Sequence, residues 1–427
     1  MKIRIKEKSF SEIATLPPYT RKKPKRQRLF WRTLLRIVSA PDLHATHFSC
    51  EKIGMEQLGK KEPALFLMNH SSFIDLKIAA RVLFPRPFNI VCTTDGFVGK
   101  HYLMRSLGCI PTNKFVADLH LVRDMRYCFQ KLKSSVLMFP EAGYSLDGTA
   151  TRLPDSLGQC AKMMGVPVVM ISTDGAYARQ PLYNQLHRRK VNVSAKMEYL
   201  LSAQDLKQKS AQEIQEIITS RFRFDNFRSQ QEAQLRIAEP DRADYLNRLL
   251  YKCPACHAEG QTHGEGTTLT CRACGKVWEL DEYGSMRALQ GKTEFSHIPD
   301  WFQWQRACVR KEVEDGAYFL DADVDIYVFS DGKCMYHVGA GHLTHSKEGF
   351  HLTDARGELD YTHRPNAAYT LNADFNWYEL GDVISFGNNE ITYYCLPQGV
   401  GDAVTKIRLA TEEIYTILQK EKSCAKA

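Results

Sequence analysis

The chain has 427 residues, enough for two or three domains with sizeable hydrophobic cores. Its 25% charged and 44% apolar residues are ordinary for a soluble globular protein, and part of its net charge of +8 is local. No apolar run approaches the ~18 residues of a membrane span, and the first residues lack the apolar core of a signal peptide. Thirteen cysteines, four spaced as metal ligands and nine scattered, exclude a disulfide framework and predict a cytoplasmic setting.

The first segment, residues 1–49, contains a basic run over 21–28 that leads into an apolar stretch over 29–38. On a helical wheel Arg28, Arg32 and Arg36 share one face, and Phe30, Trp31, Leu34, Leu35 and Val38 share the other. This pattern is typical of a helix in a membrane interface, with anionic lipids as its partner. A helix packed on the protein's own surface, a solvated basic tail and a nucleic-acid patch are the alternatives.

The second segment, residues 50–250, alternates between apolar runs and helical patterns. Strands are expected at 64–68, 88–92, 135–139, 166–171 and 191–199, and helices near 73–83, 117–133 and 155–164. This alternation predicts an α/β domain with a mixed sheet flanked by helices, followed by closing helices over 202–250. Functional sites in such domains gather where strands lead into helices.

His70 lies at such a position, after the run 64–68, and Asp75 follows about one helical turn later. A carboxylate that holds one imidazole nitrogen leaves the other free to act as a base. The alternative is that Asp75 caps its helix while His70 fills a loop. Two further clusters follow strands, at 108–114 and 140–145.

The third segment, residues 251–281, contains two Cys-x-x-Cys pairs with fourteen residues between them, formed by Cys253, Cys256, Cys271 and Cys274. Four thiolates at this spacing are typical of a tetrahedral zinc ribbon. Because a four-thiolate shell leaves no open coordination position, we expect the zinc ion to be structural. Free thiols and a nucleic-acid ribbon are the alternatives, but the segment is not notably basic.

The last segment, residues 282–427, begins with helical patterns at 283–290 and 298–313. About seven short strands follow, at 325–329, 333–338, 349–352, 368–371, 377–381, 383–386 and 390–395, and a helix over about 402–420 closes the chain. This order predicts a β-rich, barrel-like domain, of the pleckstrin-homology type or another small barrel or sandwich. We find no catalytic cluster in it and expect a packing or regulatory module.

Four clusters in the second segment resemble motifs of the glycerolipid acyltransferase family, of the lysophosphatidate (1-acyl-glycerol-phosphate) acyltransferase type. They are Asn69-His70 with Asp75; Gly108, Ile110, Pro111 and Lys114; Phe139-Pro140-Glu141; and Val-Pro-Val-Val at 166–169. The third motif departs from the family pattern, because Ala142, Gly143 and Tyr144 replace Gly, Thr and Arg before Ser145 restores the match.

The resemblance implies a peripheral-membrane O-acyltransferase on the cytoplasmic face of a membrane. His70, oriented by Asp75, would be the general base that lets a lysolipid hydroxyl attack a thioester of coenzyme A or acyl carrier protein. Backbone donors near Gly143 or a helix start are candidates for the oxyanion.

Other residues are predicted to contact the substrate. Glu141 and Lys114 match family positions associated with the acceptor phosphate, and Arg152 is a candidate substitute for the missing arginine. Asn69 is grouped with them, although we expect it to shape the turn. Tyr144 leaves the acceptor open, between lysophosphatidate and another lysolipid or alcohol. A degenerate lipid-binding scaffold that recruits partners is the alternative function.

Overall fold

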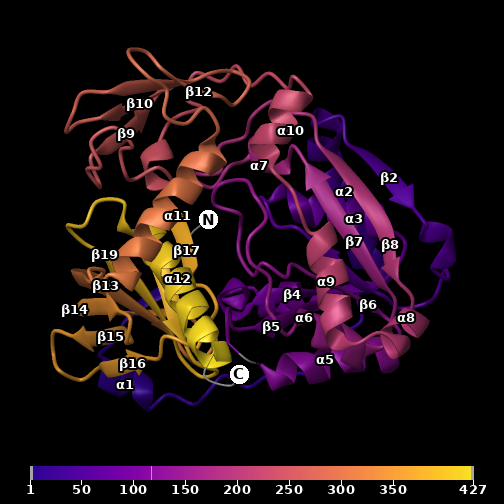
Figure 1. Ribbon diagram of the computed structural model, residues 1–427. Coiled ribbons are helices and arrows are strands. Elements are labelled where there is room, and N and C mark those ends of the chain that lie inside the picture. The colour runs from indigo at the N-terminus through magenta and orange to yellow at the C-terminus, as the bar shows by residue number, and fades with distance from the viewer. Residues whose placement is uncertain (1–2, 117, 425–427) are drawn as a thin grey trace.

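The computed structural model describes residues 3–116 and 118–424. The ends of the first and last predicted segments, 1–2 and 425–427, and residue 117 of the predicted helix 117–133 lie outside the described residues. Figure 1 shows an α/β domain on one side, a β-rich domain with its long closing helix on the other, and a small four-stranded sheet beside them. The three parts follow the order that the sequence predicts.

The α/β domain is built on a seven-stranded mixed sheet of order β2-β8-β7-β3-β6-β4-β5. Its strands are β2 (Ser49–Ile53), β3 (Leu65–Met68), β4 (Phe88–Thr93), β5 (Cys109–Thr112), β6 (Ser135–Met138), β7 (Val168–Asp174) and β8 (Ser194–Leu201). Neighbours run parallel except β7 and β8, which are antiparallel. The central strand β3 is completely buried, which explains its uninterrupted apolar sequence.

Helices cover both faces of this sheet (Figure 1). They are α2 (Leu29–Ala45), α3 (Ile74–Leu83), α4 (His101–Ser106), α5 (Leu119–Gln130), α6 (Leu157–Met164) and α7 (Ala176–Arg179), with 3-10 turns η1 (Met55–Gln57) and η2 (Thr94–Phe97). The closing helices α8 (Ala203–Gln208), α9 (Ala211–Arg221) and α10 (Asn226–Glu232) follow, and then η3 (Leu246–Arg248). Ser202 and Ser210 start α8 and α9 with capping boxes, which satisfy backbone donors at each helix start.

Helix α2 turns its arginines toward the protein and its apolar side chains outward. Arg32 donates to the carbonyl of Pro85, and the Arg36 guanidinium lies 4.4 Å from the centre of the Phe84 ring. The exposed apolar side chains of this helix are Leu29, Phe30, Leu34, Ile37 and Val38. We call these five residues the α2 apolar face. Among the described residues, no helix is long and apolar enough to cross a bilayer.

The small sheet has the order β12-β11-β10-β9 and is antiparallel. Its strands are β9 (Thr262–Glu265), β10 (Thr268–Cys271), β11 (Val277–Leu280) and β12 (Met286–Ala288). The helix expected over 283–290 is wrong, because β12 forms there and completes the sheet beyond residue 281. Trp278 of β11 packs edge-on against Trp301 of helix α11 (Ile298–Glu314), with ring centres 5.0 Å apart.

The last domain is a sheet of order β16-β15-β14-β13-β19-β18-β17. Its strands are β13 (Leu320–Phe329), β14 (Met335–Ser346), β15 (Gly349–Asp354), β16 (Asp360–His363), β17 (Asn372–Trp377), β18 (Gly381–Gly387) and β19 (Thr392–Pro397). The predicted number of strands is correct, but β16 was missed and β17 starts after the strand expected at 368–371. Among the described residues no pairing joins β16 to β17, so barrel closure stays a prediction.

Helix α12 (Ala403–Cys424) packs against α11 through buried charges. Arg306 of α11 pairs with Glu412 at 2.7 Å and with Glu413 at 3.0 Å, and Arg310 reaches Glu413 at 2.6 Å. Buried carboxylates require such partners, because an unpaired charge away from water is strongly destabilising.

The start of the chain belongs to the last domain. Strand β1 (Ile5–Glu7) pairs in parallel with β14, and Ile13 of α1 (Phe10–Ala14) is buried in the core that includes the β-rich domain. The predicted segment 1–49 is therefore divided by the structure: its first part completes a distant sheet, and its exposed large apolar side chains all lie on α2. Membrane contact stays a prediction for α2.

Candidate active site and metal centre

His70 and Asp75 form a hydrogen-bonded pair where β3 leads into α3. His70 Nδ1 lies 2.9 Å from Asp75 Oδ2. The same carboxylate oxygen accepts the backbone N–H groups of Ser71 at 2.7 Å and Ser72 at 3.0 Å. These donors hold Asp75, which is fully buried, in one position. With Nδ1–H donated to Asp75, the unprotonated Nε2 is the atom that can accept a proton.

Two aromatic rings flank the imidazole. The ring centre of Phe139 lies 4.1 Å from that of His70, and the ring centre of Tyr144 lies 4.3 Å from it. The His70 side chain remains 23% exposed. Phe73, at the start of α3, packs edge-on against Tyr144 and is itself exposed. The base is therefore fixed in orientation, partly open, and bordered by an exposed aromatic side chain.

Glu141 is buried behind His70. One carboxylate oxygen accepts the His70 N–H at 2.7 Å, and the other accepts the Thr151 N–H at 3.1 Å and the Thr151 hydroxyl at 2.9 Å. Burial raises the pKa of Glu141 to about 7, although these donors oppose the shift. The structure therefore places Glu141 as a support for the His70 backbone, with both oxygens occupied by the protein.

Asn69 and Gly143 lie on the two loops beside His70. Asn69 is buried, and its side-chain carbonyl accepts the Thr173 N–H at 2.8 Å, which ties the end of β3 to β7 as the expected turn-shaping role requires. Gly143 has no neighbouring atom within 4 Å of its Cβ position, and its N–H has no hydrogen-bond partner in the described part of the chain. That N–H is available to an oxyanion, whereas the N–H groups of Ser71 and Ser72 are occupied by Asp75.

Lys114 and Arg152, the predicted phosphate contacts, are both engaged by the C-terminal domain. Lys114 Nζ donates to Asn372 Oδ1 of β17 at 2.7 Å. Arg152 donates to Thr416 Oγ1 of α12 at 3.0 Å and pairs with Asp155 at 3.1 Å. The structure therefore does not bring these two cations together with His70 as free phosphate ligands.

The C-terminal domain also contributes residues that the sequence interpretation did not include. Asp374 of β17 and Tyr378 lie close enough to raise the pKa of Tyr144 beyond the effect of burial, as does Asp75. Burial raises the pKa of Asp374 to about 6, and nearby Lys114 opposes the shift. No local sequence signal connects β17 with the third motif, because the contact depends on how two domains pack.

The four predicted metal ligands meet in one cluster. The sulfur atoms of Cys253, Cys256, Cys271 and Cys274 all lie within 4.8 Å of one another. The Cys253–Cys274 and Cys256–Cys271 sulfur pairs are 3.8 and 3.7 Å apart. A tetrahedron with ~2.3 Å zinc–sulfur bonds has edges of about 3.8 Å, so the cluster fits a metal ion, whereas a disulfide requires about 2 Å.

Comparison with known proteins identifies the α/β domain. Residues 49–174, which contain His70, Asp75 and Glu141, match the family model described as Acyltransferase. Residues 49–174 therefore match an acyltransferase domain, which agrees with the family resemblance of the sequence motifs.

A solved structure is also similar, that of the 1-acyl-sn-glycerophosphate (LPA) acyltransferase PlsC from Thermotoga maritima. The two share 19% sequence identity with a TM-score of 0.34, over 45% of this chain and 78% of that one. None of the curated proteins matches the chain.

Proposed function

We propose that the protein is a peripheral-membrane O-acyltransferase that moves a fatty acyl group from acyl-CoA or acyl carrier protein to the hydroxyl of a lysolipid. The observation that carries the proposal is the 2.9 Å contact between His70 and buried Asp75 within the acyltransferase-family domain. A free hydroxyl is too weakly acidic to ionise at pH 7, so its attack on a thioester requires a positioned base.

In the proposed reaction, the acceptor oxygen attacks the thioester carbonyl carbon while His70 Nε2 takes the hydroxyl proton. Asp75 stabilises the imidazolium that forms. The Gly143 N–H is a donor for the oxyanion of the tetrahedral intermediate. The carbon–sulfur bond then breaks, and the departing thiolate takes the proton back from His70. Atoms and charges balance without a covalent acyl-enzyme.

A membrane location is part of the proposal. The α2 apolar face is exposed, and exposed Phe73 and Leu76 extend apolar surface onto neighbouring α3. Exposed apolar patches beside basic residues, here the run 21–28, are typical of contact with a membrane containing anionic lipid. Four cysteines spaced as metal ligands and nine scattered ones support a reducing environment, and hence the cytoplasmic face, as part of the proposal.

Two appended parts complete the proposal. The four-cysteine cluster holds a structural zinc ion and performs no chemistry, because its shell is closed. The four-plus-three strand order and closing helix of the last domain support its assignment as a barrel-like, pleckstrin-homology-type module. Nucleic acid is not an expected partner.

The experiment that tests the activity is a panel of lysolipid acceptors incubated with acyl-CoA and acyl carrier protein donors. Release of thiol should depend on an acceptor and disappear in His70→Ala, while circular dichroism shows an intact fold. Full transfer by the folded His70→Ala variant would contradict the proposed base.

Two observations favour the alternative, a catalytically degenerate lipid-binding scaffold: Lys114 and Arg152 contact the C-terminal domain, and the Tyr144 ring lies against the His70 ring. If the wild-type protein transfers to no acceptor in the panel but still sediments with lipid vesicles, the scaffold is the better description.

A further inference from the structure

The 145–151 loop holds the backbone of His70 on both of its polar groups. At one end of the loop, the Ser145 N–H donates to the His70 carbonyl at 2.9 Å. At the other end, Thr151 donates to Glu141 from its N–H and its hydroxyl. Glu141 in turn accepts the His70 N–H at 2.7 Å. The position of the proposed base therefore depends on the position of this loop.

Segment 224–226, at the start of α10, pairs with the same loop. Thr149 forms an antiparallel bridge with Asp225. The Gly148 carbonyl accepts two hydrogen bonds from Asn226, one from the backbone N–H at 2.9 Å and one from the side-chain amide at 2.7 Å. Helix α10 lies beside α7 and next to the small sheet (Figure 1). The loop is therefore fixed by a segment that borders another part of the fold.

The side chain of Asp225 is held from that other part. His297, the residue before α11, has its Nε2 atom 3.1 Å from Asp225 Oδ2 and its Nδ1 atom 3.3 Å from Asp300 Oδ1. His297 is 8% exposed, and its backbone forms a bridge with Ser285 of the small sheet's border. The contact between His297 and Asp225 therefore joins the small sheet and α11 to segment 224–226.

This geometry favours a protonated imidazole. A neutral ring has one N–H, so its second nitrogen would direct a lone pair at a carboxylate, whereas an imidazolium donates from both nitrogens. Burial alone would lower the pKa of His297, but Asp225 and Asp300 raise it above the usual 6.5. Arg228 of α10 also faces the pair, 3.8 Å from Asp225. Because the folded-state pKa is the higher one, the stabilisation is complete below pH 6.5 and is lost as the pH rises through the raised value.

We propose that protonated His297 and Asp225 form a positioning element for His70. Their ion pair holds segment 224–226, this segment holds the 145–151 loop, and the loop holds the His70 backbone. A displaced base slows the reaction without weakening substrate binding, by about 100-fold for a displacement of about 1 Å. The effect on the rate rests on the proposed acyl transfer, but the effect on the loop does not.

The first measurement is therefore independent of activity. Hydrogen exchange of the full chain, followed by mass spectrometry, gives the protection factors of residues 145–151. At pH 6, His297→Gln should lower this protection at least tenfold relative to the wild type, because the ion pair is lost. The difference should shrink as the pH rises to 9, since the wild-type imidazole then loses its proton. Equal protection of both proteins at pH 6 would overturn the inference.

The second measurement is acyl transfer to an acceptor from the panel. At pH 6, His297→Gln should lower kcat at least tenfold and leave the KM for the acyl donor unchanged. The ratio of wild-type kcat to variant kcat should fall toward one as the pH rises to 9. A ratio independent of pH would overturn the role of the imidazolium charge. Absence of transfer by the wild type would count against the proposed function, whereas the exchange measurement would still decide the inference.

Asp225→Asn removes the other half of the ion pair. Asparagine is also a good helix-capping residue, so α10 should still begin at Asn226. We expect this variant to lower loop protection and kcat as His297→Gln does. The double variant should be no worse than either single one, because all three lose the same interaction. Additive losses would show that the two side chains act separately and would overturn the proposed pair.

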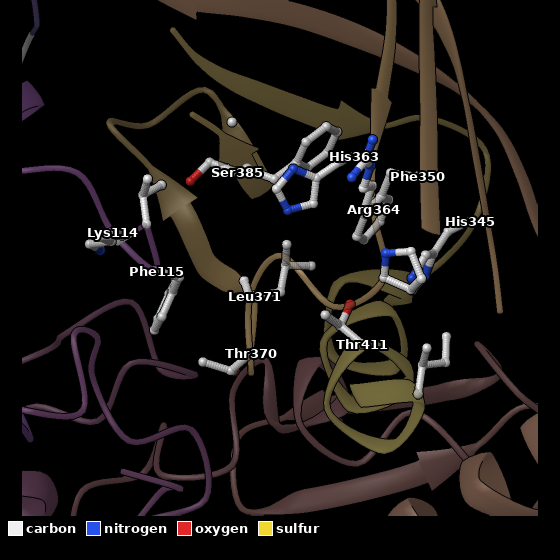
Figure 2. Close-up of a pocket in the computed structure, with 16 residues that line it drawn as sticks. Lys114, Phe115, His345, Phe350, His363, Arg364, Thr370, Leu371, Ser385 and Thr411 are labelled. Carbon is white, nitrogen blue, oxygen red and sulfur yellow. The ribbon is translucent and has the colours of Figure 1, made fainter. Parts of the chain in front are cut away.

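Two other histidines of the chain supply matched controls. His342→Gln removes an exposed imidazole that also lies between two carboxylates, at 3.0 and 3.3 Å. His363→Gln removes a half-buried imidazole beside the strands of the last sheet (Figure 2), where its partner is the Tyr361 hydroxyl at 3.2 Å. Both controls should match the wild type in loop protection and in kcat at every pH. A similar loss in either one would show that the effect is not specific to His297 and would overturn the inference.

Discussion

Glu141 accepts the backbone N–H of His70 at 2.7 Å, so a buried carboxylate of the third motif holds the loop that carries the proposed base. The family resemblance suggested a substrate contact at this position. In the folded chain, Glu141 instead fixes the position of the His70 backbone. The N–H and hydroxyl groups of Thr151 donate to the other carboxylate oxygen of Glu141.

Glu141→Gln should therefore damage both stability and activity. An amide would direct an N–H group at a backbone N–H, leaving a buried donor unpaired at a cost of about 1–3 kcal/mol. We expect a lower free energy of unfolding in urea and at least tenfold slower acyl transfer. Glu314→Gln, at an exposed site at the end of α11, is the control. Unchanged stability would show that Glu141 does not support the loop.

Asp75→Asn tests the orientation of the base. The asparagine can retain a hydrogen bond to the ring but cannot stabilise an imidazolium, so we expect transfer to slow by about 10²–10⁴-fold with similar affinity for the acyl donor. Thiol release measures the rate. The control Asp315→Asn, at an exposed site, should leave the transfer rate unchanged. Full activity of Asp75→Asn would show that the Asp75 carboxylate is not needed for the reaction.

Tyr144→Arg restores the side chain of the family motif. Asp75 and Asp374 lie close enough to Tyr144 to affect its pKa, so a cation at this position has compensating charges. We expect the preference for lysophosphatidate over a neutral lysolipid to rise about tenfold, since an arginine can bind phosphate with two parallel hydrogen bonds. Exposed Tyr102→Arg is the matched control. An unchanged preference would place the acceptor headgroup away from Tyr144.

Phe30→Glu tests the α2 apolar face. Phe30 is 66% exposed, so the variant should fold normally, yet sedimentation with anionic vesicles should fall at least tenfold because burial of a phenyl ring is worth about 1.5–3 kcal/mol. Phe319→Glu changes a residue that is 63% exposed in the other domain and should sediment like wild type. Equal sedimentation of both variants would show that the α2 apolar face does not make the membrane contact.

Glu412 predicts an acid transition. Burial alone would raise its pKa, but Arg306 and Arg408 lower it from 4.5 to about 2. Because the folded-state pKa is the lower one, its stabilisation, on the order of 3 kcal/mol, is complete above pH 4.5 and is lost as the pH falls toward 2. Thermal unfolding between pH 2 and 7 should show this loss of stability in the wild type and in the control Glu421→Gln, which changes an exposed glutamate. The stability of Glu412→Gln should depend less on pH.

The buried core of the first sheet and the metal ligands were predictable, because both signals are local. Strand β3 is an uninterrupted apolar run, and the spacing of the two cysteine pairs in the sequence is by itself typical of a metal site. Strands β2 and β5 were missed, because their sequences SCEKI and CIPT are short and mixed. The partners of Lys114 and Arg152 were not predictable, since they lie 258 and 264 residues away along the chain and are brought close by domain packing.

The pairing of β1 with β14 has a consequence for biosynthesis. Ile5 lies opposite Met335, so β1 leaves the ribosome about 330 residues (335 − 5) before its partner strand does. Contacts this distant in sequence form slowly, and an unpaired strand edge on a nascent chain invites association with other chains. A bulky fusion at the amino terminus should therefore reduce the yield of folded protein more than the same fusion at the carboxyl terminus.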